Sequence, residues 1–409
     1  MAKYRPSPHG IGVVLGLWLA GVFVVGLLSR IYLHGSGPLF ALAGAVLWPL
    51  VYFLISSRRF VPTPPQSGML FAIGIFVLFG GLSVYVSPIM WQSMAYFCMT
   101  LLVFLLALQF NSNLDLKSYE FGLGFYAFLT TVALLAFAAY DYTPGQRLGN
   151  GTNILNPNTV GMVSLSVILS ATAIRRAVRR YAVMLPALGV LIMTDSRASS
   201  VAVLGGLFVV FIMRLKSARS RQRAMIFGAA ALALVVAAFF SGVLISAFTS
   251  YFAIHNKYRG LGTGFTGRFT VWRTVWDLFL ENPILGVGFR SLSEVIGIEA
   301  HNGYLNLLAE IGLPGSIGVA YILFAGMTSM RKDARDPQLL PLLSVLTGLA
   351  VGYLMLAIFE RYLFDIGNPT SLIFILAILR PKKARRNTVN RSSFVMPRPA
   401  MGGASERRP

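Results

Sequence analysis

The sequence predicts an all-α polytopic membrane protein with about twelve transmembrane helices and one large external loop that carries an interfacial helix. Of its 409 residues, 56% are hydrophobic and only 12% are charged, about half the charged share of a soluble domain. The mean hydropathy is +0.69, so too few polar residues exist to cover a water-facing surface, which excludes a soluble globular protein. The single cysteine, Cys98, excludes an internal disulfide and a multi-thiolate metal site.

Apolar runs of roughly 20 residues, the length that crosses the hydrocarbon core, define the predicted spans. In chain order the runs are 11–33, 38–56, 68–88, 92–110, 119–140, 158–174, 181–194, 198–213, 225–247, 302–328, 338–359 and 361–379. The first run has basic flanks like a signal peptide, but it is long and no clear cleavage site follows, so we expect a retained anchor. The run 181–194 is short, so the count holds to within about one helix.

The distribution of Lys and Arg predicts the orientation of these spans. With the N-terminus in the cytoplasm, 26 of the 35 basic residues fall on the cytoplasmic side, as the positive-inside rule requires. Both termini are therefore expected to be cytoplasmic. Residues 1–380 would form the membrane domain, and residues 381–409, rich in Arg, Pro, Ser and Gly, would form a disordered basic tail against anionic lipid.

The predicted external connections are short except for residues 248–301. Because other loops are minimal, this long segment is the natural place for chemistry. Nine basic residues remain on the external side: Arg30, Arg147, Arg197, Lys257, Arg259, Arg268, Arg273, Arg290 and Arg361. The planar guanidinium suits phosphate, so these arginines predict an anionic ligand. Solvated loop charges or contacts with lipid headgroups are the alternative.

An amphipathic helix is predicted within the long loop. The stretch from Arg268 places Phe269, Trp272, Trp276 and Phe279 in one helical stripe, and the Asn-Pro at 282–283 ends the helix. We expect this helix to lie in the membrane interface with its aromatic side chains in lipid. The G-x-G-x-x-G at 262–267 is not a dinucleotide site, because no strand precedes it.

A polar stripe begins where the chain re-enters the membrane. Asn302, Asn306 and Glu310 recur every four residues, and His301 stands at the entrance of the stripe. Polar groups inside a membrane normally face a cavity or a partner, so the stripe is a candidate functional wall. These side chains could equally serve only to tie helices together.

Six short motifs follow one another along the chain: Asn156-Pro157-Asn158, Ser196-Arg197, Gly267-Arg268 with Trp272, Asn282-Pro283 with Gly286-x-Gly288, His301-Asn302-x-Tyr304-Leu305 and Glu310-x-Gly312. In this order they resemble the O-antigen ligase and polysaccharide polymerase superfamily. The resemblance covers roughly residues 145–320, and the first five helices match only in hydropathy.

The resemblance implies a glycosyltransferase of the bacterial inner membrane that acts at the periplasmic face without a metal or cofactor. Its donor would be a glycan on undecaprenyl pyrophosphate. Its acceptor would be a sugar hydroxyl on a lipid-linked repeat unit or on lipid A core. Membrane lipids are implied partners, a chain-length regulator and a flippase are candidate partners, and nucleic acid is not expected.

The resemblance also implies roles for particular residues. His301 would contact or deprotonate the acceptor hydroxyl as the catalytic residue. Arg197 and Arg268 would hold the donor pyrophosphate. The implied substrate-binding residues are Arg197, Arg268, Asn302, Tyr304, Glu310, Arg147 and Asn158. The residue chemistry fits, because arginine stabilises charge on a leaving pyrophosphate and a near-neutral imidazole accepts a proton.

Two reactions and one other class of protein remain open. The sequences of residues 301–305 and 312–315 resemble those of exopolysaccharide polymerases. This resemblance favours polymerisation of exopolysaccharide or O-antigen repeat units over ligation onto lipid A core. A transporter that flips lipid-linked sugars is the second class. It would be expected to carry charged groups across many helices instead of at one face.

Overall fold

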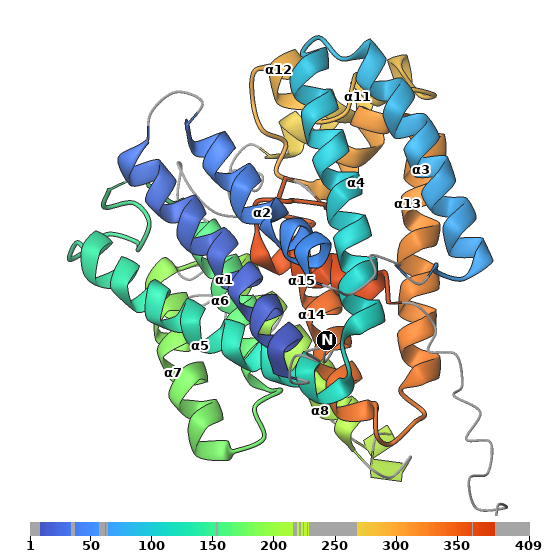
Figure 1. Ribbon diagram of the computed structural model, residues 1–409. Helices are drawn as coiled ribbons and strands as arrows, with labels where there is room; N and C mark the ends of the chain where they lie inside the picture. Colours follow the sequence, from blue (N-terminus) through green and yellow to red (C-terminus); the bar gives the residue numbers. More distant parts are fainter. Residues whose placement is uncertain are drawn as a thin grey trace, which may run out of the picture.

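The structure is a computed structural model that describes residues 9–33, 37–56, 62, 64–152, 154–215, 219–220, 222–223, 225–226, 228, 268–361 and 363–380. Within these residues the secondary structure is helical and no strand occurs (Figure 1). In chain order the helices are α1 (His9–Tyr32), α2 (Gly37–Ile55), α3 (Ser67–Val86), α4 (Met90–Asn113), α5 (Leu116–Asp141), α6 (Pro157–Ala171), α7 (Ala177–Thr194), α8 (Arg197–Arg214), α11 (Arg268–Glu281), α12 (Leu292–Ile296), α13 (Gly303–Asp333), α14 (Leu340–Leu356) and α15 (Pro369–Ile378).

Seven of the described helices are long and apolar enough to cross a membrane: α1 over Gly10–Tyr32, α3, α4, α5, α7, α8 and α13. Helices α6, α14, α15 and the Phe40–Ile55 part of α2 are apolar but have only 10–17 residues. The structure therefore confirms an all-helical, multi-pass membrane protein but not the predicted twelve spans. Most of the run 225–247, the loop up to residue 267 and the tail 381–409 lie outside the described residues.

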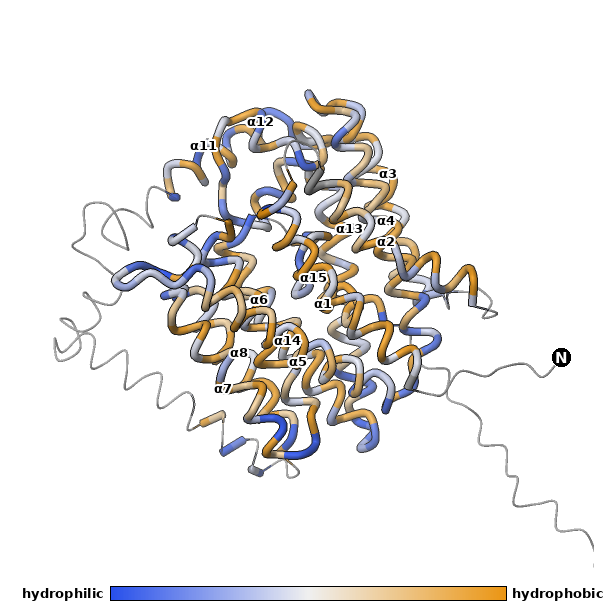
Figure 2. The backbone as a smooth tube through the Cα atoms, turned by 60° about the vertical axis from the view of Figure 1, so that its left-hand side comes forward, coloured by the Kyte–Doolittle hydropathy of each residue, from blue (hydrophilic) through white to orange (hydrophobic). Residues whose placement is uncertain are grey.

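The helices surround a buried centre. Every residue of α15 is buried, and this helix lies in the middle of the bundle in both views (Figures 1 and 2). Helices α11 and α12 lie together at one end of the bundle (Figure 1). Figure 2 shows hydrophilic residues gathered towards the two ends, with hydrophobic residues between them, as membrane crossing requires.

The predicted span 361–379 is shorter than expected. Helix α15 begins only at Pro369, where the Asn368 side chain accepts a hydrogen bond from the backbone N–H of Thr370 at 2.9 Å. An asparagine cap followed by proline at the first helical position is a strong start signal. The described residues 357–361 and 363–368 therefore lie between α14 and α15, and they include the charged Glu360, Arg361 and Asp365.

Small residues bring α8 and α14 into close contact. A Cβ atom added to Gly206 would lie 2.9 Å from the carbonyl oxygen of Gly348, and one added to Gly352 would lie 3.0 Å from that of Ala202. Glycines permit such close packing of helices in a membrane. Because position 202 faces 352 and position 206 faces 348, the two helices are antiparallel. The first residue of α8, Arg197, therefore lies at the end where α14 finishes.

Helix α13 is broken at Gly312, whose φ of 68° and ψ of −179° are not helical. Pro314 follows and has no N–H to donate. The break removes the in-helix donors for the carbonyl oxygens of Ala309 and Glu310. Such groups must find other partners in a membrane, where water cannot satisfy them.

The connection after α11 supplies those partners. Three backbone bonds join it to the break: Val287 N–H donates to Ala309 O (2.9 Å), Gly288 N–H to Glu310 O (3.2 Å) and Leu313 N–H to Pro283 O (2.8 Å). The Asn-Pro at 282–283, the glycines at 286 and 288 and the Glu-x-Gly at 310–312 thus form one interlocked unit. We call residues 282–288 with 309–313 the α13 break.

Replacement of Gly286 by alanine should destabilise the protein by about 2–5 kcal/mol, because strain and overlap add. Its φ is 69°, and a Cβ there would overlap the carbonyl oxygens of Ala309 and Glu310. Gly297→Ala is the matched control, since its φ is 71° but no atom lies within 4 Å of the added Cβ. The temperature of half-unfolding of the purified protein measures both. Equal losses would mean that the α13 break does not require the close approach.

Candidate functional site

The candidate site is built on the first turn of α13, where the chain places His301 directly before the helix. The Asn302 side chain caps α13 by accepting hydrogen bonds from the N–H groups of Tyr304 and Leu305, both at 3.1 Å. His301 itself has a φ of 47°, an uncommon left-handed conformation for a non-glycine residue. Cap and turn together fix the imidazole at the start of the helix.

The connection after α14 lies against this turn. The N–H of Gly303 donates to Ala357 O at 2.8 Å, and the Tyr304 hydroxyl donates to Leu354 O at 2.7 Å. The Asn306 side chain donates to Arg361 O. The polar atoms of Asn302, Tyr304 and Asn306 thus hold the site together, while Tyr304 remains 38% exposed.

Charged side chains from three segments meet around His301. Glu299 forms an ion pair with Arg361, and its Oε2 lies 3.7 Å from His301 Nε2. Arg268, the first residue of α11, lies with its Cζ 5.9 Å from the centre of the Phe359 ring. Among the described residues, no group of three or more His, Cys, Asp or Glu side chains could hold a metal ion.

Burial and charge set the protonation of this cluster. Burial, and then the positive charge of Arg268, lower the pKa of His301 below its ordinary value of 6.5. Burial raises the pKa of Glu360 to about 7, although Arg268 opposes the shift. Burial also lowers the pKa of Arg268, against the attraction of Glu360. His301 is therefore neutral at pH 7 and able to accept a proton.

A second cluster surrounds the turn between α7 and α8. Asp195, with a φ of 46°, ends α7, and the half-buried Arg197 begins α8. Arg147 donates from Nε to Thr194 O at 2.8 Å and from an Nη atom to Asp195 O at 3.1 Å. These carbonyls end a helix, where a cation is favourable. Arg147 therefore fastens the 141–156 loop to the turn that presents Arg197.

The two clusters lie at the same end of the bundle. Asn158, the second residue of α6, accepts a hydrogen bond from the Ser196 hydroxyl at 3.3 Å, so the start of α6 meets the α7–α8 turn. The antiparallel packing of α8 and α14 then places Arg197 near the end of α14. Ala357 follows that end and bonds the start of α13, which carries His301.

Glu310 occupies a different environment from His301. It is 3% exposed, and its Oε1 accepts a long hydrogen bond from Leu292 N at 3.4 Å. The stripe at 302, 306 and 310 therefore bonds three different backbone segments: its own helix start, the 357–361 connection and the start of α12. This is the role of tying elements together that the sequence left open.

The aromatic stripe of α11 differs in part from its predicted position in lipid. Phe269 and Trp276 are 53% and 45% exposed, but Phe279 is only 7% exposed. The Trp272 indole N–H donates to Ala300 O at 2.8 Å. Two of the four aromatic side chains are thus used to dock α11 beside α13, because Val275 and Phe279 pack with Ala309 in one apolar cluster. This docking fixes the position of Arg268, the first residue of α11, relative to His301.

Two acidic residues of the site, Glu299 and Glu360, are absent from the sequence prediction. Glu360 stands between two apolar runs, and an isolated carboxyl in such a break was the available signal. Glu299 lies two residues before His301, so its proximity was visible in the sequence. Of the outer basic residues, Lys257 and Arg259 lie outside the described part of the chain.

Comparison with known proteins finds a similarity over part of the chain. Residues 182–320 match the family described as O-antigen ligase. Arg197, Arg268 and His301 all fall within the matched residues, whereas Arg147, Asn158 and Glu360 lie outside them. The match confirms the resemblance for the motifs from Ser196 to Gly312. Among curated proteins, none matches the chain.

Proposed function

Because residues 182–320 match the O-antigen ligase family, we propose that this chain transfers a glycan from undecaprenyl pyrophosphate to a sugar hydroxyl, at the periplasmic face of the bacterial inner membrane. The family itself indicates a membrane glycosyltransferase-like ligase or polymerase. The observation that supports the proposed chemistry is that His301 lies close to the half-buried Arg268, and that burial and the charge of Arg268 lower the pKa of this histidine. Polymerisation of repeat units is the proposed reaction, and ligation onto lipid A core is the alternative.

Arg268 and Arg197 are proposed to bind the donor pyrophosphate. A guanidinium donates two parallel hydrogen bonds to phosphate oxygens. When the bond between the sugar anomeric carbon and the pyrophosphate oxygen breaks, that oxygen keeps the electron pair and its negative charge grows. A fixed positive charge in a partly buried site stabilises this charge more than water does, and it does so without a metal ion.

His301 is proposed to act on the acceptor. As the acceptor hydroxyl oxygen bonds to the anomeric carbon, the neutral imidazole accepts the hydroxyl proton. The imidazolium that forms has the Glu299 carboxylate 3.7 Å from Nε2, and this negative charge favours it. Glu299 also pairs with Arg361, which fixes the carboxylate beside the imidazole.

The rate of transfer should rise with pH through the pKa of His301, below 6.5, and then level off. Arg268→Gln removes a positive charge that lowers this pKa, so the rising limb should move to higher pH when measured at saturating donor. Glu360→Gln is the control that separates the two titrating groups. If His301 is the base, the Glu360→Gln variant should still show the rise of rate with pH. If the rise disappears in this variant, Glu360 is the group that accepts the proton.

The orientation predicts which introduced cysteines react from outside the cell. In a Cys98→Ala background, Asn282→Cys lies at the end of α11 and should react with an impermeant thiol reagent. Gln338→Cys lies at the opposite end, between α13 and α14, and should not react before the membrane is permeabilised. Both positions are exposed. The reverse pattern would place the His301 cluster in the cytoplasm and contradict the proposed face.

Chromosomal deletion distinguishes the two reactions. If the protein is a polymerase, single lipid-linked repeat units should accumulate. Loss of O-antigen from lipopolysaccharide with accumulation of lipid-linked polymer would show ligation instead. A purified protein that transfers no sugar between a lipid pyrophosphate donor and an acceptor, yet moves lipid-linked glycan across vesicles, would support the transporter class.

A further inference from the structure

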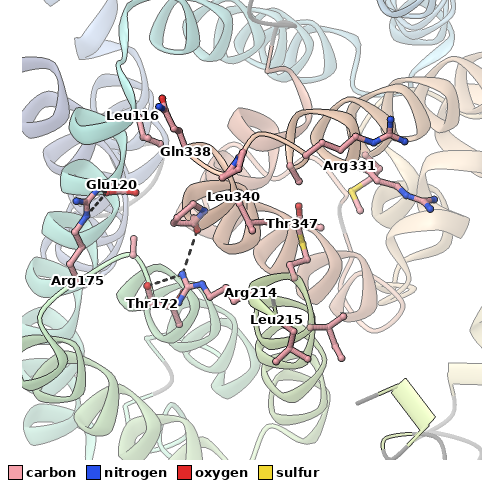
Figure 3. A pocket seen from close by; sticks show the side chains of 18 of the residues that line it. Leu116, Glu120, Thr172, Arg175, Arg214, Leu215, Arg331, Gln338, Leu340 and Thr347 are labelled. Carbon is pink, nitrogen blue, oxygen red and sulfur yellow. Dashed lines mark hydrogen bonds and ion pairs between the residues drawn. The ribbon is translucent and has the colours of Figure 1, made fainter. Parts of the chain in front are cut away.

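A large cavity lies at the end of the bundle opposite to His301. Its volume is about 1730 Å³, and it is lined by the α6–α7 turn, the last residues of α8 and the α13–α14 turn. The Arg197 cluster lies at the start of α8 and the His301 cluster at the start of α13, whereas the cavity lies at the ends of these two helices. Figure 3 shows side chains that line this cavity, none of which takes part in the proposed glycan transfer.

The lining of the cavity is strongly basic. Five arginines contribute to it: Arg175, Arg180, Arg214, Arg331 and Arg335. The one acidic lining residue, Glu120, is already paired, since its Oε2 accepts from Nε and an Nη atom of Arg175 at 3.0 and 2.8 Å. The remaining arginines leave a net positive charge around the space, which attracts an anion.

Arg214 is held in place at the cavity by neutral oxygen atoms. Its Nε donates to the Ser344 hydroxyl at 2.9 Å, and an Nη atom donates to Thr172 O at 3.0 Å and Pro341 O at 3.4 Å (Figure 3). These partners orient the guanidinium without neutralising it. A preorganised guanidinium of this kind suits a phosphate group.

Apolar side chains form the rest of the wall and continue onto the outer surface. Ile212, Met327 and Leu340 line the cavity. Phe324 also lines it and is 67% exposed, and Phe211 on the last part of α8 is 56% exposed. In a membrane protein, such exposed rings face acyl chains. The cavity therefore combines anion-binding groups with an apolar surface that lipid can reach.

We propose that this cavity binds the phosphate headgroup of an anionic membrane lipid. Soluble phosphate would satisfy the arginines but leave the apolar wall without a partner. The chain's own tail does not complement the cavity, because residues 381–409 carry eight Lys and Arg and a single Glu. The inference is independent of the proposed reaction, since it concerns residues at the other end of the bundle.

Two triple variants with equal loss of charge test the proposal. Arg180→Gln with Arg331→Gln and Arg335→Gln removes cavity charges. Arg176→Gln with Arg179→Gln and Lys332→Gln removes neighbouring exposed charges that do not line the cavity. Binding of phosphatidylglycerol to the full-length protein in detergent is measured by native mass spectrometry, with phosphatidylcholine as the neutral lipid. The affinity for phosphatidylglycerol should fall about tenfold or more in the cavity variant, because each arginine near an anionic headgroup contributes to the free energy of lipid binding.

The remaining outcomes decide against or for a lipid. Equal losses in the two triple variants, or equal binding of phosphatidylcholine, would reduce the effect to general surface charge and overturn the proposal. Inorganic phosphate should not displace phosphatidylglycerol. If phosphate alone bound through the same three arginines and phosphatidylglycerol did not bind, the ligand would be a soluble anion and the lipid proposal would fail. Arg214→Gln adds a second test, since it should also weaken binding of phosphatidylglycerol. If the Arg214→Gln variant does not fold, the cavity triple variant alone tests the proposal.

Discussion

His301→Ala is expected to lower glycan transfer by a factor of about 10²–10⁴, the range for a positioned general base. Burial and Arg268 lower the pKa of the imidazole, so the substitution removes the group that we propose takes the acceptor proton. Binding of the lipid pyrophosphate donor should stay near normal. Transfer and donor binding are measured on the same purified variant, so that the two steps are separated.

Asn302→Ala separates the cap from the imidazole. It keeps the His301 side chain but removes the cap that helps to fix it, which should cost about 1 kcal/mol of stability, so its loss of transfer should be smaller than that of His301→Ala. Turnover of His301→Ala within a few-fold of wild type would remove His301 from the mechanism. Weakened donor binding in that variant would move it into the pyrophosphate site beside Arg268.

Arg268→Lys and Arg197→Lys should each lower transfer by about 10²–10³-fold, as loss of a fixed charge-stabilising donor does. An ammonium cannot bridge two phosphate oxygens in one plane, although it keeps the charge. At position 268 the substitution also removes the guanidinium from the Phe359 ring. Expression and membrane insertion should be unchanged, and steady-state transfer together with donor affinity gives the effect.

Arg273→Lys provides the control on the same helix, because Arg273 is exposed on α11. Arg30→Lys provides a second control, since this exposed side chain donates to Ile154 O at 3.2 Å. Both controls should transfer glycan at close to the wild-type rate. Full activity with lysine at both 197 and 268 would count decisively against a pyrophosphate clamp.

Hydropathy predicted the existence and order of α1 to α8 and of α13 to α15, because a lipid environment requires long apolar segments with internal hydrogen bonds. It did not predict the short α12. It did not predict how much of each run is helical. The run 361–379 was expected to span the membrane, yet α15 begins only at Pro369. The Asn-Pro pair at 368–369 carried that information, but the continuous apolar composition outweighed it.

The site was predictable where the residues are neighbours in the sequence and not where they are distant. The cap at Asn302 and the break at Gly312 follow from local residue types. The contact of the Asn306 side chain with Arg361 joins residues 55 positions apart, and nothing in the local pattern of either predicts it. The same holds for Arg268 and Glu360, which tertiary packing alone brings together.

The α13 break has a consequence for the order in which the chain is synthesised. Its partners at 283–288 precede α13, so they have left the ribosome before α13 enters the membrane, and the free carbonyl groups can be satisfied at once. The contacts of His301's turn with Leu354, Ala357 and Arg361 depend on segments made later. We therefore expect a chain that stops after α13 to insert with the break closed, but without the contacts that the later segments make with the turn of His301, and to lack the proposed transfer activity.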